Sequence, residues 1–144
     1  MPTHPTAPKP AFARAFLRGT AHFNAQQFWE AHEAWEELWL ASESDLVEFL
    51  QGMIQLAAAY HHVQRGTLRG AVRLFDASLR RLDPFPLRFC EIDRSRADEA
   101  ARRHRSWAAG QIAGEGADSL AISEYPALEL LTRNEEFVPP RNPW

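Results

Sequence analysis

The sequence predicts an all-α protein, an antiparallel bundle of about five helices followed by an irregular C-terminal extension. Apolar residues recur at helical spacing in five separate stretches. The breaks between these stretches are short and rich in turn residues, so consecutive helices should be antiparallel neighbours. Strand-like runs are short: the candidates are 85–92, which proline interrupts, and 121–125. The sequence therefore predicts almost no strand.

The chain divides into a tail and one domain. Residues 1–10 hold four prolines and no apolar periodicity, so we expect a flexible tail there. Residues 11–144 are of the length of a single domain and should fold as one helical unit. The predicted helices span 11–23, 26–41, 45–65, 67–82 and 94–109.

Glycine and proline set the expected helix ends. Gly66 should end the third helix, and the prolines at 84 and 86 should prevent the fourth from continuing. Asp93, or a capping box of Ser95 and Asp98, should open the fifth helix. Glycines 110, 114 and 116 should end it, and 117–144 should wrap the bundle without a regular element.

Charge and cysteine content narrow the function classes. The net charge of −3 is small, and this indicates neither nucleic acid nor an anionic membrane as a partner. The longest apolar stretch, 46–63, carries too many polar groups to cross a membrane. With one cysteine, Cys90, and no secretory signal at the start, we expect a cytoplasmic protein.

The helix over 26–41 carries ionisable residues among aromatic ones. On a helical wheel with His32 as origin, Phe28, Trp35 and Trp39 fall within about 60° of it, and Glu36 lies about 40° away. We therefore expect His32 and Glu36 to be buried. The other acids, Glu30, Glu33 and Glu37, fall on the opposite side and should face solvent.

The helix over 45–65 is apolar almost all round, so it should lie at the centre of the bundle. Its reverse side carries a polar stripe that should face His32 and Glu36. This predicts a polar pocket of His32, Glu36, Gln51, Gln55 and His62, behind an aromatic wall of Trp29, Trp35 and Trp39.

This pocket has two chemical interpretations. A buried carboxylate needs a partner, so a structural hydrogen-bond network with no cofactor is the first. The second is a divalent metal or acid–base site, in which His32 and Glu36 act with His62 or His61. The spacing of His32 and Glu36 is similar to the zinc-protease motif H-E-x-x-H, but Glu33, which would be the base, faces solvent on the wheel.

Other reactive side chains have structural explanations. Cys90 lies in an apolar stretch and should be an inert buried thiol. His104 lies on the packing face of the fifth helix and should sit at the edge of the core.

Two segments together resemble a known family. Residues 23–39 (FNAQQFWEAHEAWEELW) and 49–62 (FLQGMIQLAAAYHH), followed by Gly70 and Ala71, resemble the domain of unknown function 309 family over about 11–84. The resemblance implies a compact all-α bundle of small prokaryotic proteins with no established activity or cofactor. The family's characteristic positions correspond here to Phe28, His32, Glu33, Trp35, Glu36, Trp39, Gln51, Gly52, Gln55 and His62.

A second pattern is similar to tetratricopeptide-type hairpins. Gly66, Ala71, Phe75 and Ser78 have that motif's offsets, although Pro84 comes one residue late. A helical-hairpin scaffold that binds a peptide is therefore one alternative function.

The sequence identifies neither a substrate nor a partner. The leading interpretation is a non-catalytic module that binds a small ligand or a protein, and the competing one is a metal-dependent or acid–base enzyme using His32, Glu36 and His62. The large aromatic content is compatible with a homodimer.

Overall fold

The structure, a computed structural model, describes residues 9–43, 45–114 and 120–131. Helices dominate these ranges, and the all-α fold class is confirmed. The tail over 1–8, the Gly116 helix stop and the extension over 132–144 lie outside the described residues. The elements are α1 (Pro10–Asn24), α2 (Phe28–Leu40), α3 (Asp45–Arg65), α4 (Leu68–Leu82), β1 (Arg88–Phe89), β2 (Ile92–Asp93), α5 (Ser95–Gly114), η1 (Ile122–Glu124) and β3 (Glu129–Leu130).

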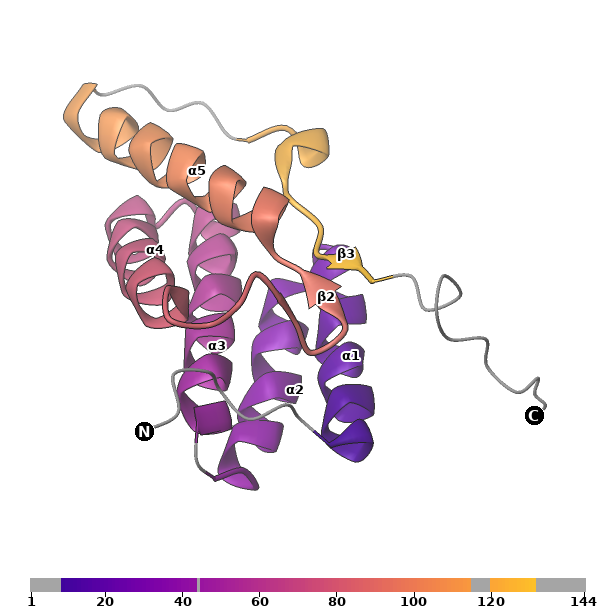
Figure 1. Cartoon of the computed structure of the whole chain (residues 1–144). Helices are drawn as coiled ribbons and strands as arrows, with labels where there is room; N and C mark the ends of the chain where they lie inside the picture. Colours follow the sequence, from indigo (N-terminus) through magenta and orange to yellow (C-terminus); the bar gives the residue numbers. More distant parts are fainter. Residues whose placement is uncertain (1–8, 44, 115–119, 132–144) are drawn as a thin grey trace.

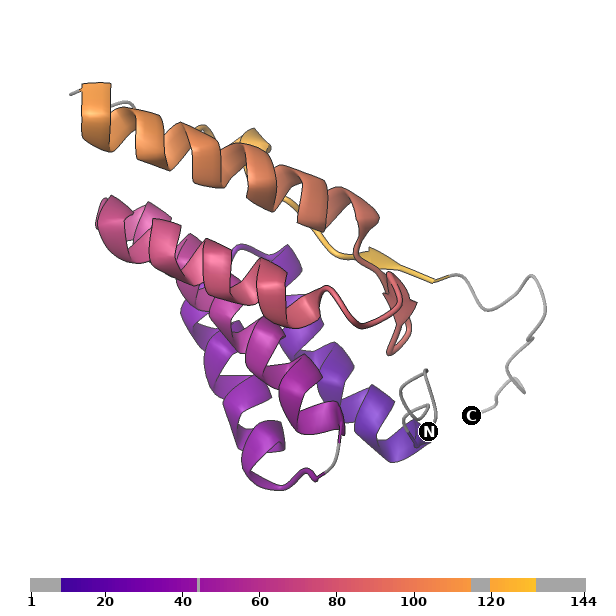
Figure 2. The same ribbon diagram turned by 60° about the vertical axis from the view of Figure 1, so that its left-hand side comes forward.

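Each helix packs against its neighbour in the sequence. The rings of Phe23 and Phe28 meet where α1 turns into α2, and Trp29 at the start of α2 contacts His61 near the end of α3. Such contacts between a beginning and an end make consecutive helices antiparallel, as predicted. Figures 1 and 2 show α1 to α4 side by side, with α5 lying across the bundle along α4.

Two tight turns join these helices. Gly66 ends α3 with a φ of 79°, a conformation that costs glycine little because it has no Cβ. Gln26, between α1 and α2, adopts a φ of 61°, and its carbonyl oxygen accepts a hydrogen bond from Gln64 Nε2 of α3. α1 begins at Pro10, within the predicted tail, because proline is favoured in the first helical turn.

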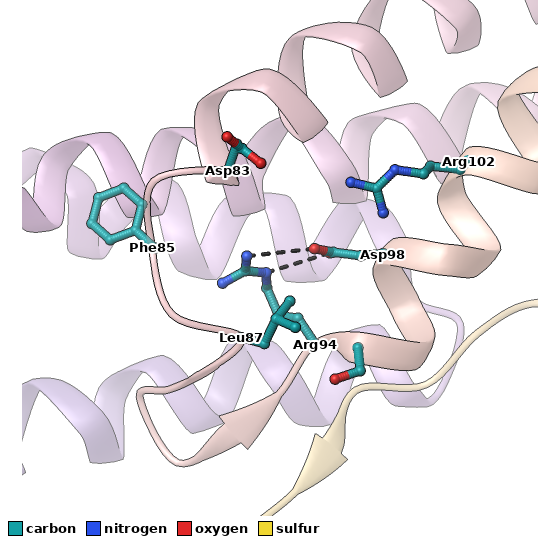
Figure 3. Close-up of a pocket in the computed structure, with 7 residues that line it drawn as sticks. Asp83, Phe85, Leu87, Arg94, Asp98 and Arg102 are labelled. Atoms are coloured by element: carbon teal, nitrogen blue, oxygen red, sulfur yellow. Dashed lines mark hydrogen bonds and ion pairs between the residues drawn. The ribbon is translucent and has the colours of Figure 1, made fainter.

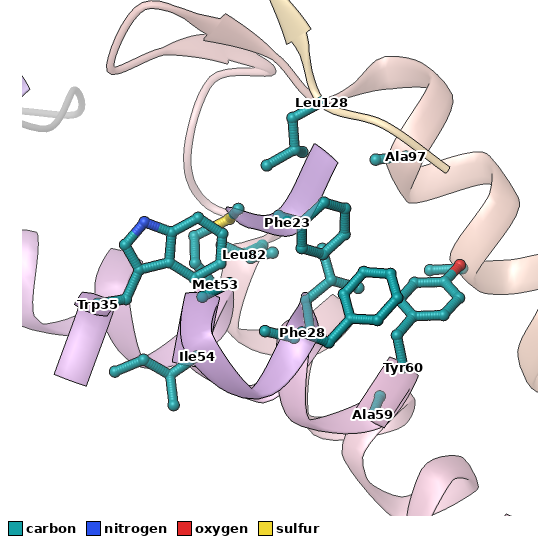
Figure 4. Close-up of a cluster of buried hydrophobic side chains, with 14 of the residues drawn as sticks. Phe23, Phe28, Trp35, Met53, Ile54, Ala59, Tyr60, Leu82, Ala97 and Leu128 are labelled. Carbon is teal, nitrogen blue, oxygen red and sulfur yellow. The ribbon is translucent and has the colours of Figure 1, made fainter. Parts of the chain in front are cut away.

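The core is aromatic and runs between the helices (Figure 4). Phe23, Phe28 and Tyr60 form a chain of rings, with centroids 4.9 Å apart for the first pair and 5.3 Å for the second. Trp35 is fully buried, and its indole N–H donates to the Phe16 carbonyl oxygen at 3.0 Å. It lies against Gly19 of α1, where any side chain would overlap the indole. These contacts fix the rotation of α2 about its axis.

The region after α4 differs from the prediction. β1 pairs with β2, and β2 with β3, in a small antiparallel sheet, although no strand was predicted at 129–130. Asn24 of α1 holds this segment, because its Nδ2 donates to the Leu128 carbonyl oxygen at 2.9 Å and its Oδ1 accepts from the Leu128 N–H at 2.6 Å. The prediction that residues after 117 carry no regular element is therefore wrong for 122–124 and 129–130.

Helix α5 also runs further than predicted, to Gly114 instead of 109. Gly110 does not end it, because this residue lies in open space with helical backbone and needs no special conformation. At its start Asp93 provides the cap: the Asp93 Oδ1 accepts from the Ser95 N–H at 2.8 Å and from the Ser95 hydroxyl at 2.6 Å. This bonding leaves Asp98 free for another role.

Candidate functional site

The buried face of α2 is not centred on His32. Phe28, Ala31 and Trp35 are the buried residues of this helix, and their mean direction lies roughly 65° from His32 on the helical wheel. His32 is therefore half-buried at the border of the interface. Glu36 is exposed, so the prediction that it is buried with His32 is wrong.

The predicted aromatic wall separates for the same reason. Trp35 is in the core, whereas Trp29 is 46% exposed. Trp39 is half-buried, and its indole N–H is enclosed without a hydrogen-bond partner among the described residues, as is Nδ1 of His32. Trp29, Trp35 and Trp39 thus belong to three environments and do not line one pocket.

Trp29 instead caps a small ring cluster at the edge of α2 and α3. Its indole stacks on His32, with centroids 4.7 Å apart and planes 19° apart, and lies 5.1 Å from the His61 ring. Partial burial lowers the pKa of His61, and the neighbouring Arg65 lowers it further, while Glu30 acts in the opposite sense. Both histidine rings therefore pack against the indole of Trp29, which still remains 46% exposed.

The polar stripe of α3 faces α4 and not α2. Arg81 of α4 donates from Nε to the Gln55 Oε1 at 3.3 Å. Nδ1 of His62 is hydrogen-bonded to the Thr67 hydroxyl at 2.6 Å, and its ring packs on Gly70. Partial burial, followed by the nearby Arg73, lowers the pKa of His62. These residues hold the hairpin of α3 and α4 together.

The five predicted pocket residues therefore do not converge. Gln51 is half-buried on α3 and makes no side-chain hydrogen bond within the described residues. In the part of the chain that the structure describes, no group of three or more His, Cys, Asp or Glu side chains could hold a metal ion. His32, Glu36 and His62 are among the described residues and do not form such a group, so the geometry gives no support to a shared three-ligand site.

The outer face of α2 has an unusual charge pattern. Glu30, Glu33, Glu36 and Glu37 are all exposed, as predicted for all except Glu36. None forms an ion pair or hydrogen bond with a described residue, and the last turn of the helix holds no basic residue. Like charges three or four residues apart, and acids near a helix C-terminus, each destabilise a helix by about 0.2–1 kcal/mol. This face therefore carries uncompensated negative charge.

Large apolar side chains share that face. Leu40 is 74% exposed, and with Trp29, Glu33 and Glu36 it falls within about 60° on the wheel. We call these four residues the α2 outer stripe: a tryptophan and a leucine at its ends with two carboxylates between them. Sequence reasoning missed the stripe because it placed Trp29 in the aromatic wall of the predicted pocket. The signal in the sequence was the i, i+4, i+7 and i+11 spacing of the four residues, which places them on one face of a helix.

The interior contains a second polar pair, under α5. Tyr60 and His104 are buried, and the Tyr60 oxygen lies 2.7 Å from Nδ1 of His104. Burial raises the pKa of Tyr60 and lowers that of His104 to about 4. The prediction that His104 lies on the packing face is confirmed. Cys90 is also buried as predicted, which raises its pKa to about 12 and leaves the thiol protonated at neutral pH.

A buried ion pair was not predicted from the sequence. Arg94 is 1% exposed, and its Nε and Nη2 each lie 3.4 Å from an oxygen of Asp98 (Figure 3). The available signal was the i, i+4 spacing of Arg94 and Asp98 across the start of α5. The ion pair was missed because Asp98 was assigned to a capping box with Ser95.

Within the described residues, no helix is both long enough and apolar enough to cross a lipid bilayer. No curated protein matches the chain. The family model described as "Domain of unknown function (DUF309)" matches residues 16–74, which run from the first half of α1 into α4 and include all of α2 and α3. This match supports the resemblance of the segment over 16–74 to the DUF309 family.

Proposed function

We propose that this chain is a non-catalytic binding module whose α2 outer stripe binds a basic amphipathic helix of a partner protein. The observation that carries the proposal is the unpaired acidic face of α2 with Trp29 and Leu40 exposed at its two ends. The residues of the alternative, an enzyme using His32, Glu36 and His62, lie in different environments and receive no comparable support.

Charge selects the class of partner. An arginine or lysine placed between Trp29 and Leu40 would pair with Glu33 and Glu36, and it would remove the like-charge repulsion that the free helix carries. The indole of Trp29 can also receive a cation on its solvent side, since a guanidinium stacks well on tryptophan. A second copy of this chain fits less well, because a two-fold contact through this stripe would place glutamates against glutamates.

Spacing selects the shape of the partner. Trp29 and Leu40 are eleven residues apart, which corresponds to roughly 16 Å along a helix. A partner helix lying along α2 can contact both with apolar side chains about three turns apart, in the way that amphipathic helices bind to apolar surfaces. The consecutive antiparallel hairpins of α1 to α4 supply a rigid support for this face, in line with the helical-hairpin scaffold considered from the sequence.

The test uses a synthetic amphipathic peptide with leucines on one face and arginines on the other, and a control peptide with glutamates in place of the arginines. Titration calorimetry on the full chain should detect the arginine peptide and not the glutamate peptide. Trp29→Ala should weaken binding by about tenfold or more, since a buried interface tryptophan typically contributes over ~1.4 kcal/mol.

The matched control is Leu130→Ala, which removes another exposed apolar side chain, in β3 and away from the α2 outer stripe. Leu130→Ala should bind as the unaltered chain does. Equal binding of both peptides, or undiminished binding by Trp29→Ala, would refute the proposal.

A further inference from the structure

A cavity of about 350 Å³ lies where α4 ends and α5 begins, away from the α2 outer stripe (Figure 3). Its volume is at the small end of the ~300–1,000 Å³ range of ligand pockets. Two acids, two arginines, a serine and two apolar residues line it. The charged and apolar ones are Asp83, Asp98, Arg94, Arg102, Phe85 and Leu87.

The buried ion pair of Arg94 and Asp98 forms one wall. Arg94 also donates to the carbonyl oxygens of Leu82 at 3.1 Å and Pro86 at 3.0 Å. These bonds hold the guanidinium in place and compensate its charge. One N–H of its Nη1 has no partner among the described residues, because a guanidinium has five donors and the structure gives four bonds.

The other two charges are unpaired. Asp83 follows the last residue of α4, and Arg102 lies one turn after Asp98 on α5. Both are exposed, and neither forms an ion pair or hydrogen bond within the described part of the chain. Figure 3 shows the Asp83 carboxylate and the Arg102 guanidinium on the same side of the ion pair, coming from different elements. One cavity thus offers one free negative and one free positive group.

We propose that this cavity binds a free α-amino acid with an apolar side chain. Its ammonium group would pair with Asp83 and its carboxylate with Arg102, which can bind a carboxylate through two N–H groups. Phe85 and Leu87 provide the apolar contact for the side chain. A simple anion would meet two carboxylates here, and a simple cation two guanidinium groups, so a zwitterion matches this wall best.

The experiment is a calorimetric titration of the full chain with L-leucine or L-phenylalanine, and with two leucine derivatives that each lack one charge. N-acetyl-L-leucine has no ammonium group, and L-leucinamide has no carboxylate. We expect a free amino acid to bind, and both derivatives to bind about tenfold more weakly or worse, since each loses one charge-assisted contact. No binding of either amino acid up to ~10 mM, a concentration that would reveal even millimolar affinity, overturns the proposal.

Two variants locate the site. Asp83→Asn and Arg102→Gln should each weaken amino-acid binding by about tenfold or more, because each removes one ionic contact. The matched controls are Asp45→Asn and Arg96→Gln, which alter exposed residues of the same types outside the cavity. Thermal melts confirm folding of all four. Binding that survives both cavity variants would also overturn the proposal, whatever the outcome for the α2 outer stripe.

Discussion

The surroundings of α5 and the outer face of α2 differ in how their charged side chains are paired. Around α5, two arginines are paired with acids: Arg105 donates to Asp76 at 2.9 Å, and Arg94 lies 3.4 Å from Asp98. On the outer face of α2, the acids have no cation paired with them among the described residues. Folding has therefore compensated charge at these helix contacts and has left the described part of α2 with uncompensated negative charge.

The same contrast divides the tryptophans of α2. Trp35 is fully buried with a bonded indole N–H, whereas Trp29 is 46% exposed and rests on histidines. Burial of an aromatic side chain stabilises the fold, and exposure of one provides contact area for association. We infer that the two residues serve stability and binding separately.

The largest predicted effect concerns the buried ion pair of Arg94 and Asp98. Arg94→Met should lower the free energy of unfolding by about 3–5 kcal/mol, because it leaves the Asp98 carboxylate buried without a cation. Urea unfolding measures this. Arg105→Met, which breaks a solvent-exposed pair, should cost far less, since water screens that interaction. Equal losses would show that burial does not distinguish the two pairs.

The next effect compares the two tryptophans. Trp35→Phe should lower the free energy of unfolding by about 2 kcal/mol, because it removes a buried hydrogen bond and leaves a void. Trp29→Phe should change stability little. Thermal melts of the two variants decide the matter. If Trp29→Phe were the more destabilising change, Trp29 would be a structural residue and the contrast would fail.

The pH dependence of stability tests the buried Tyr60–His104 pair. Burial lowers the pKa of His104 from 6.5 to about 4, so the unfolded chain takes up a proton at a higher pH than the folded one. The stabilisation is complete above pH ~6.5 and is lost as the pH falls toward ~4, by about 2 kcal/mol between pH ~7.5 and ~5. Urea unfolding at these two pH values measures it.

His104→Phe is the informative variant for this prediction. The pKa values of His61 and His62 are also lowered, so they contribute in the same direction and should leave a smaller pH dependence in the variant. A pH dependence unchanged by His104→Phe would mean that other groups cause it.

The smallest effect concerns the acidic face. The double variant Glu33→Gln/Glu36→Gln should raise the free energy of unfolding by about 0.5–1 kcal/mol, because it relieves like-charge repulsion along α2. The gain should shrink in ~0.5 M salt, which screens exposed charges. Glu99→Gln/Glu124→Gln, the same change in net charge at two exposed positions elsewhere, should give no such gain.

Periodicity and turn residues were sufficient to predict the helices. The spans of α3 and α4 follow from Gly66 and Pro84, because these residues act through the local backbone. The prediction that α5 ends at Gly110 was wrong because glycine permits a helix end but does not force one. The small sheet could not be predicted, since it depends on Asn24 holding Leu128, a contact between residues far apart in the sequence.

The candidate site was harder to predict than the fold. A helical wheel gives relative angles, but the rotation of α2 depends on the fit of Trp35 against Gly19 of α1. An error of roughly 65° in that rotation was enough to move Glu36 from solvent to interior. Likewise, the wheel of α3 cannot say which neighbour covers Gln55 and His62, and the structure assigns both to α4.

The most direct test of the central claim is the affinity of Glu33→Gln/Glu36→Gln for the arginine-bearing amphipathic peptide, measured by calorimetry beside the unaltered chain and Glu99→Gln/Glu124→Gln. We predict that the α2 variant binds about tenfold more weakly even though it is the more stable protein, because two ion pairs together contribute ~1.4 kcal/mol. Unchanged affinity in the α2 variant would contradict the assignment of this face as the binding surface.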